Sequence, residues 1–130
     1  MQRVRWALLL AGVAALPGCL AAAAAAGAGT GIYLTTRGAE STVNGTVDNV
    51  AQRTRSVFSS EGIVMDATSS ESGGDKRQFK GKKGDLDITA TLERQSETTT
   101  KVDVEARKNL AEWDKDYAQQ LLTKIVKAGE

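Results

Sequence analysis

The chain has 130 residues, and its 17 lysines and arginines nearly balance its 16 aspartates and glutamates, which gives a formal net charge of +1. An overall positive field of the kind that attracts nucleic acid is therefore excluded, and any electrostatic role must be local. Histidine is absent and cysteine occurs once, so the sequence lacks the commonest general base and cannot form an intramolecular disulfide or a thiolate metal cage. We expect a protein that is not an enzyme, with no metal or other cofactor and no nucleic-acid partner.

The N-terminal residues 1–18 have the order of a secretory signal peptide. Arg3 and Arg5 precede the apolar run WALLLAGVAAL at residues 6–16, which is too short to span a bilayer. An alternative interpretation treats residues 6–34 as one alanine-rich transmembrane helix. The Pro-Gly pair in the middle of that stretch and the glycines near its end weaken such a helix, so we favour the signal peptide.

The tetrapeptide Leu16-Pro17-Gly18-Cys19 resembles the lipobox of bacterial lipoproteins, in which a small residue directly precedes the cysteine. The resemblance implies cleavage between Gly18 and Cys19 and acylation of the Cys19 thiol, so that the mature chain is anchored in a lipid bilayer. Leu20 stands next, where an aspartate favours retention in the inner membrane in the lipoproteins that this chain resembles. We therefore expect a lipid-anchored protein of the outer membrane that faces the periplasm.

After the cysteine, an alanine- and glycine-rich tether at residues 19–37 leads to a small domain at residues 38–130. Threonines and β-branched residues predict a strand within residues 32–45, and an Asn-Gly pair then turns the chain towards Thr46, a predicted helix cap. The inward face of the strand is expected to carry Ala39, Ser41 and Val43. The apolar stripe of the helix that follows is expected to consist of Val47, Val50, Ala51, Thr54, Val57 and Phe58.

Four strands and a second helix are expected in the rest of the chain. In the first of these strands Ile63, Met65 and Ala67 alternate, and the two last strands show strict alternation of apolar and polar residues. One face of the sheet is thus polar and solvated, whereas the apolar face needs a helical cover. The strands are expected at residues 63–67, 76–82, 86–94 and 98–107, and the helix near residues 112–128.

The predicted fold class is α+β: an antiparallel sheet of about five strands, in the order strand, helix, four strands, helix, with both helices on one face. The shared apolar positions predict a single core. Its members are expected to include Val50, Val57, Phe58, Ile88, Val104, Leu121 and Ile125.

Several stretches together resemble a family of short bacterial envelope lipoproteins that is known as an uncharacterised domain of unknown function. These stretches are the Gly-Cys pair with its tether, the helix TVDNVAQRTRSVFSSEGI, the block KRQFKGKKGDLDITATLE, the strand TKVDVEAR and the closing helix. The resemblance covers nearly the whole mature chain. It implies an α+β envelope lipoprotein and no catalytic or binding residues.

A basic cluster stands out from the otherwise balanced charge. Five cations, Lys76, Arg77, Lys80, Lys82 and Lys83, lie within eight residues. We interpret them as the solvated face of an edge strand, where lysines prevent unwanted strand pairing. The alternative is a patch that binds an anionic partner. In either case Lys76, Lys80 and Lys82 are expected to share the solvent face, with Lys83 beside them at the turn.

Two further groups near the C-terminus are interpreted as structural. Glu112, Asp114 and Asp116 are expected to cap the last helix rather than to bind calcium, because the ordered glycine-containing loop of a calcium site is absent. Trp113 and Tyr117 are interpreted as core residues of the same helix, with a ligand-stacking pair as the alternative.

Together these features predict a membrane-anchored envelope lipoprotein that acts as a non-catalytic docking or structural module. Its sheet or its basic hairpin is expected to bind an envelope protein or an anionic polymer. A small-molecule carrier, or an accessory subunit of an envelope enzyme, is the alternative. Unfilled volume between helices and sheet is the sign expected of a carrier, behind the small residues Ala39, Ala67, Ala90 and Ala106.

Overall fold

A computed structural model gives the structure of the protein and describes residues 31–129. The predicted signal peptide, its cleavage site, the lipidation site Cys19 and the tether as far as residue 30 lie outside the described residues. The elements are β1 (Tyr33–Leu34), β2 (Gly38–Asn44), α2 (Val47–Ser60), β3 (Val64–Glu71), η2 (Ser72–Gly74), β4 (Lys76–Lys83), β5 (Leu86–Arg94), β6 (Thr99–Arg107) and α3 (Lys115–Lys127).

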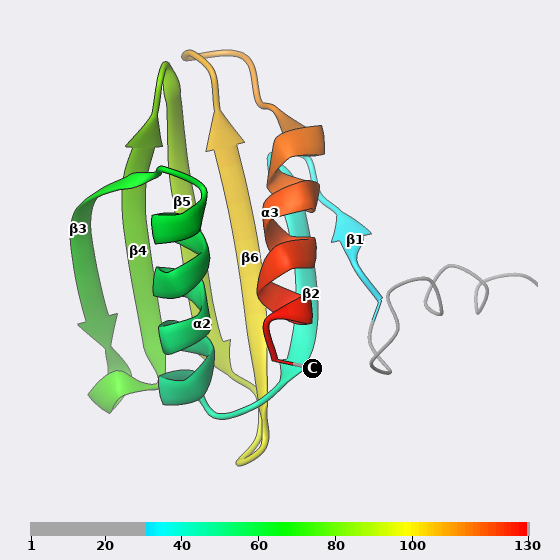
Figure 1. Ribbon diagram of the computed structural model, residues 1–130. Helices are drawn as coiled ribbons and strands as arrows, with labels where there is room; N and C mark the ends of the chain where they lie inside the picture. The colour runs from blue at the N-terminus through cyan, green and yellow to red at the C-terminus, as the bar shows by residue number, and fades with distance from the viewer. Residues whose placement is uncertain (1–30, 130) are drawn as a thin grey trace, which may run out of the picture.

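The strands form one antiparallel sheet in the order β1-β2-β6-β5-β4-β3, and α2 and α3 lie side by side against one of its faces (Figure 1). The predicted α+β class, with an antiparallel sheet and both helices on one face, is confirmed. Within residues 31–129 the sheet has six strands rather than about five, because Tyr33 and Leu34 pair with Glu40 and Ala39 of β2. Strand pairing therefore begins in the segment that the sequence analysis assigns to the tether.

Helix α2 has the cap and the buried stripe that its sequence predicts. The Thr46 hydroxyl accepts a hydrogen bond of 3.2 Å from the Asn49 N–H, one of the amides that lack a partner within the helix. Gly62 adopts a φ of +74°, which turns the chain out of the helix towards β3. The stripe is confirmed, since all its members are buried: Val47, Val50, Ala51, Thr54, Val57 and Phe58.

The alternation predicted for the first part of β3 is wrong at Ala67. Met65 pairs with Gly81 of β4, but Ala67 pairs with Lys80, so Asp66 is an extra residue in β3. Such an insertion reverses which face the later side chains point to. Ala67 therefore shares a face with Lys80, away from the helices.

The remaining strands follow the predicted alternation. Gly84, with a φ of +59°, stands with Asp85 between β4 and β5, in a turn that favours glycine at such a dihedral. In β5 and β6 every second side chain is buried against the helices, and their neighbours point to the other face. The buried members are Ile88, Ala90, Leu92, Thr100, Val102, Val104 and Ala106.

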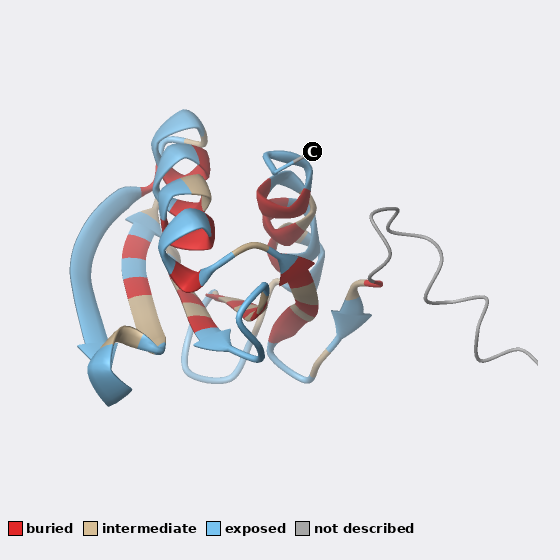
Figure 2. Ribbon diagram, turned by 90° about the horizontal axis from the view of Figure 1, so that it is seen from below, coloured by how far each residue is buried: buried red, intermediate tan, exposed pale blue. Residues whose placement is uncertain are grey.

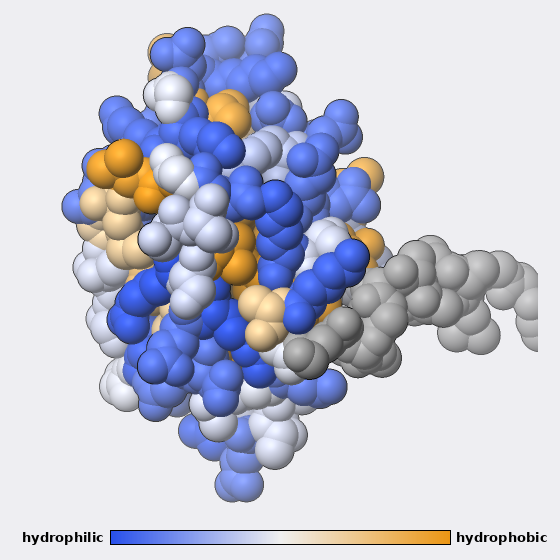
Figure 3. All heavy atoms as spheres, in the orientation of Figure 1, coloured by the Kyte–Doolittle hydropathy of each residue, from blue (hydrophilic) through white to orange (hydrophobic). Residues whose placement is uncertain are grey.

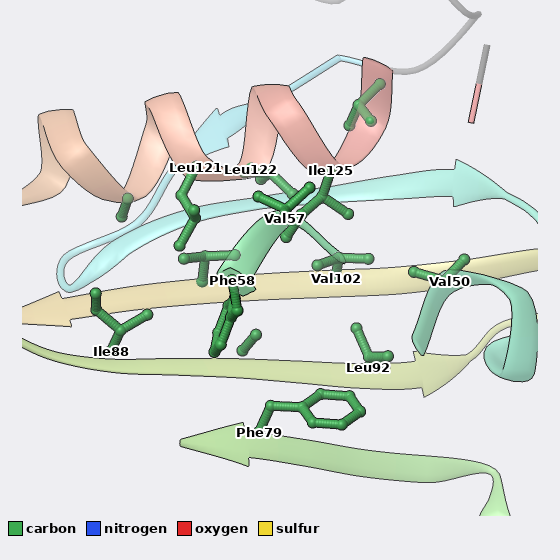
Figure 4. Packing of buried hydrophobic residues seen from close by; sticks show 14 of the residues in the cluster. Val50, Val57, Phe58, Phe79, Ile88, Leu92, Val102, Leu121, Leu122 and Ile125 are labelled. Carbon is green, nitrogen blue, oxygen red and sulfur yellow. The ribbon is translucent and has the colours of Figure 1, made fainter. Parts of the chain in front are cut away.

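The core lies between the helices and the sheet, where Phe58 of α2 and Leu121 and Ile125 of α3 meet side chains from β4, β5 and β6 (Figure 4). All seven residues predicted to share one core belong to this cluster. Most of the burial lies on the sheet-facing sides of the helices and on the sheet beneath them, whereas β3 is exposed along its whole length (Figure 2). In residues 31–129, no helix has the length and apolar character needed to cross a membrane.

Candidate binding surface

The sheet has a polar face opposite α2 and α3, which we call the open face. Exposed or half-buried side chains of β4, β5, β6 and β2 point to it because they alternate with the buried ones. Directly opposite residues of neighbouring strands lie on the same face. Across the two central strands and their neighbours, the open face includes Lys76, Gln78, Lys80, Lys82, Asp87, Thr89, Thr91, Glu93, Lys101, Asp103, Glu105, Arg107, Glu40 and Thr42.

The structure divides the five cations of the basic cluster between the two faces of the sheet. Lys76, Lys80 and Lys82 alternate on the open side of β4, as expected. Arg77 lies on the helix side, where its guanidinium forms an ion pair with Asp48 in the first turn of α2. The cluster therefore does not act as one patch.

Lys83 is also separated from the others, contrary to expectation. Its ammonium group lies 3.6 Å from a Glu61 carboxylate oxygen and 5.2 Å from the centre of the Tyr117 ring, both on the helix side of the sheet. The physical reason is strand parity: Lys83 belongs to β4, so its side chain points opposite to that of Lys82. Lys83 thus connects β4 to both helices.

The interpretation of the basic strand as an edge strand is wrong. β4 is hydrogen-bonded to β3 on one side and to β5 on the other, and β3 forms the edge. The lysines of β4 therefore do not protect an edge. Lys82 instead faces Asp87 across the β4–β5 pair, with 3.7 Å between their charged groups.

The structure also corrects the prediction that Trp113 is a core residue of the last helix. Helix α3 begins after Asp114, whose carboxylate accepts a hydrogen bond of 2.9 Å from the Tyr117 N–H, so Trp113 precedes the helix. The Asp114 N–H donates to the Ala106 carbonyl (2.7 Å), and Trp113 pairs through its backbone with Arg107. These bonds place the half-buried indole on the open face.

Two guanidinium groups lie over the Trp113 indole. The centre of the Arg37 guanidinium is 5.3 Å from the ring centre, and that of Arg107 is 5.8 Å from it. Both distances fall within the range of cation–π attraction. Arg37 comes from the loop between β1 and β2, so this contact joins two residues that are 76 positions apart in the sequence.

A groove of about 380 Å³ opens beside this indole, at the end of the sheet where β4 ends and β5 begins. We call it the Trp113 groove. Three cations and three carboxylates line it together with Thr89 and the indole, so the groove has a balanced charge. These charged residues are Arg37, Lys80, Arg107, Asp66, Asp87 and Glu105.

Carboxylates gather in the middle of the open face, next to the groove. Burial raises the pKa of the Asp103 carboxyl, and the neighbouring carboxylates of Glu105 and Glu40 raise it further, against the opposing effect of Lys101 and Arg37. The Lys101 ammonium group lies 3.5 Å from a Glu40 carboxylate oxygen, and this ion pair compensates part of the negative charge. Among the described residues, no group of carboxylates has the arrangement of a metal site.

The other candidates from the sequence have structural roles. The predicted cap is confirmed for Asp114, the N-cap of α3, and for Asp116 in its first turn, whereas Glu112 lies before the cap. Tyr117 packs against the core, on the other side of the sheet from Trp113, so the two do not form a ligand-stacking pair. Its hydroxyl is buried and has no hydrogen-bond partner among the described residues.

The four alanines behind which unfilled volume was expected in a carrier do not lie together. Ala39, Ala90 and Ala106 are fully buried in the core cluster, and Ala67 lies on the other face and lines the Trp113 groove. The groove itself was missed by sequence analysis. The residue that could have indicated the position of Trp113 is Asp114, because a helix N-cap at this position places Trp113 outside the helix.

Comparison with known proteins gives no match, either among family models or among curated proteins.

Proposed function

We propose that the protein is a lipid-anchored envelope lipoprotein that acts as a non-catalytic docking module, with the open face at the Trp113 groove as its docking surface. The observation that supports this most is the position of Trp113. A half-buried indole on an otherwise polar sheet face, between two arginines and next to a groove, has the composition of the centre of a protein interface, where tryptophan and arginine are enriched.

The balanced charge favours a protein partner over an anionic polymer. A polymer of negative charge would meet Asp66, Asp87 and Glu105 in the groove as well as its cations. A protein surface can present charges of both signs in matching positions, and complementary potentials of this kind fix orientation and exclude other partners. The partner we propose is therefore an envelope protein with both acidic and basic side chains.

The anchor is proposed from the sequence. The signal peptide and the Leu-Pro-Gly-Cys motif favour acylation of Cys19, and mass spectrometry of the mature protein tests it: we expect a chain that begins at a lipid-modified Cys19. Cys19→Ser should leave an unprocessed precursor. An unmodified Cys19 in the mature membrane-bound protein, or retention of residues 1–18, would contradict the anchor. Outer-membrane residence is tested by the fractions of a sucrose gradient.

The docking surface is tested by photo-crosslinking in intact cells. A photoreactive residue in place of Thr89, which lines the groove, should give adducts with an envelope protein. The matched control carries the same residue in place of Gln119, which is exposed on α3 on the other side of the molecule. Adducts from position 89 should weaken when Trp113→Ala is added.

Three results would contradict this proposal. Equal adducts from positions 89 and 119 would mean that the groove is not a specific surface. Adducts that persist unchanged with Trp113→Ala would remove the indole from the interface. Adducts with polysaccharide in place of protein would favour the anionic polymer as the partner.

A further inference from the structure

Strand β3 is an edge strand with unusual exposure. All eight of its residues are exposed, it pairs with β4 alone, and in Figure 2 it lies beyond the cover of the helices. Figure 3 shows an apolar spot on the surface near the start of this strand. The strand begins with two exposed apolar side chains, Val64 (67% exposed), which pairs with Lys82 and so points to the open side, and Met65 (36% exposed), which pairs with Gly81 and points to the helix side. The strand therefore presents a row of backbone N–H and C=O groups to solvent.

Folded proteins protect such an edge with lysines, prolines or bulges, or keep it very short. The opposite edge of this sheet is short, since β1 has two residues. β3 contains neither lysine nor proline, and its one irregularity is the extra residue Asp66. From Ala67 to Glu71 the strand is regular and unprotected, until Ser72, Gly73 and Gly74 turn the chain at positive φ.

We propose that β3 pairs antiparallel with β3 of a second copy of this chain, over residues Ala67–Glu71. In the register that uses all five residues, Ser69 lies opposite Ser69 of the second copy, on the two-fold axis. Thr68 then lies opposite Ser70, and Ala67 opposite Glu71. Residues that face each other must share a face of the sheet, and this register satisfies that condition: Ala67, Ser69 and Glu71 point to the open side, whereas Thr68 and Ser70 point to the helix side.

The charges around this register are complementary. The acidic residue in the paired segment, Glu71, lies opposite Ala67 of the second copy and so avoids another carboxylate. Lys80 is the β4 neighbour of Ala67, and Lys76 is the β4 neighbour of Glu71. Each Glu71 would thus lie between its own Lys76 and, past the small Ala67 side chain, Lys80 of the second copy. The hydroxyls of Thr68 and Ser70 can pair across the helix side.

Five residue pairs form a small interface, so the dimer is expected to be weak in dilute solution. Anchoring two copies in one membrane raises their effective concentration, but the pairing does not depend on it. The paired segment adjoins the Trp113 groove at Ala67 and its β4 neighbour Lys80, but the backbone edge that would pair and Ser69 on the axis are not part of the groove lining. Failure of the pairing would therefore leave the docking proposal untouched.

Disulfide trapping tests the pairing and its register. Opposed residues in an antiparallel pair have Cα atoms about 4.5–5.5 Å apart, within the range of about 4.4–6.8 Å that a disulfide spans. Ser69→Cys in the full-length protein in membranes, oxidised with copper phenanthroline, should give a covalent homodimer. Thr68→Cys should give little disulfide-linked dimer, since Thr68 lies opposite Ser70 of the second copy and the two Thr68 residues are only diagonal neighbours. Wild-type protein, with Cys19 alone, and Gln119→Cys set the background.

A second variant tests the same pairing without cysteine. Ser69→Lys places two ammonium groups on the axis and should abolish chemical crosslinking between copies, whereas Ser59→Lys on α2 adds the same charge away from the edge and should leave it unchanged. A Ser69→Cys homodimer no stronger than that of Gln119→Cys would overturn the proposal. A stronger covalent dimer from Thr68→Cys than from Ser69→Cys would overturn the proposed register. A mixed disulfide with a different protein, in place of the homodimer, would show that the β3 edge pairs with that protein and not with a second copy.

Discussion

The Glu61 carboxylate, directly after the last turn of α2, forms an ion pair with the Lys124 ammonium group of α3. The Lys83 ammonium group lies 3.6 Å from the other oxygen of the same carboxylate. One side chain thus connects both helices to β4 at one end of the core. The hydrogen bond from Lys124 is the main cause that lowers the pKa of Glu61 below its ordinary value of 4.5, and Lys83 adds to it.

We predict that Glu61→Gln lowers the free energy of unfolding at neutral pH, by about 1 kcal/mol or less because the ion pairs are partly exposed. An acid with a lowered pKa in the folded state stabilises the fold above its ordinary pKa, and this contribution is lost as the pH falls through the folded pKa. The difference between the variant and the wild type should therefore shrink below about pH 4.5. Urea unfolding at pH 7 and pH 3.5 measures it, and an equal difference at both values would contradict the prediction.

Asp103 is predicted to behave in the opposite way. Its pKa is raised, first by burial and then by Glu105 and Glu40, so the folded state binds a proton more tightly than the unfolded state. Stability then falls as the pH rises through the interval between the ordinary pKa of 3.8 and the raised one. Asp103→Asn should stabilise the protein at pH 7 by about 0.5 kcal/mol, and the gain should vanish below the ordinary pKa.

The control for Asp103 is Glu93→Gln, which removes an exposed carboxylate of β5 that points to the same face. It should give no comparable stabilisation. Thermal unfolding of both variants across pH 3–7 separates an effect of the carboxylate cluster from a general effect of net charge. A destabilised Asp103→Asn protein at pH 7 would show that the carboxylate has a favourable partner.

Phe58→Ala should cost about 3–5 kcal/mol of unfolding free energy, because the ring is fully buried between α2 and the sheet and its removal leaves a cavity. Leu110→Ala is the matched control. Leu110 is 88% exposed, so its truncation should change stability by less than about 0.5 kcal/mol. Denaturant unfolding compares the two, and similar losses would mean that the helix packs in another register.

Gly38→Ala should destabilise the protein although it adds a single methyl group. A Cβ at this position would lie 1.9 Å from the Val104 carbonyl oxygen, a backbone atom of the neighbouring strand β6. The strands must shift apart to admit it, which costs about 1–3 kcal/mol. Thr42→Ala, further along β2, serves as the control for a change on the same strand. A neutral Gly38→Ala would mean that β2 is free to move relative to β6.

The helices and the middle of the sheet were predictable because their patterns repeat over many residues. The stripe that includes Val50 and Phe58 has the spacing of a helix, and the alternation in β5 and β6 fixes which side chains are buried. The two-residue strand β1 is too short to give such a pattern. The extra residue Asp66 reverses which face the later side chains of β3 point to. A short exposed strand has no sequence pattern from which such an extra residue could be predicted.

The candidate site was less predictable, since it depends on contacts between distant segments. Arg37 and Trp113 meet on the open face only because the loops at one end of the sheet converge there. The basic cluster was visible in the sequence, but its meaning depended on the parity of Lys83 and on the sheet order, which makes β4 an inner strand. Strand order is set by tertiary packing, which local patterns do not contain.

The pairing of β2 with β6 determines how late in synthesis the sheet can be completed. The partner residues of β2 in β6, such as Thr100 and Val104, lie about sixty positions later, whereas β3, β4 and β5 follow one another as hairpins with local contacts. Distant pairings form late because the intervening chain must first be ordered. During synthesis or export from the N-terminus, β2 must therefore wait, unpaired on that side, until nearly the whole chain has emerged.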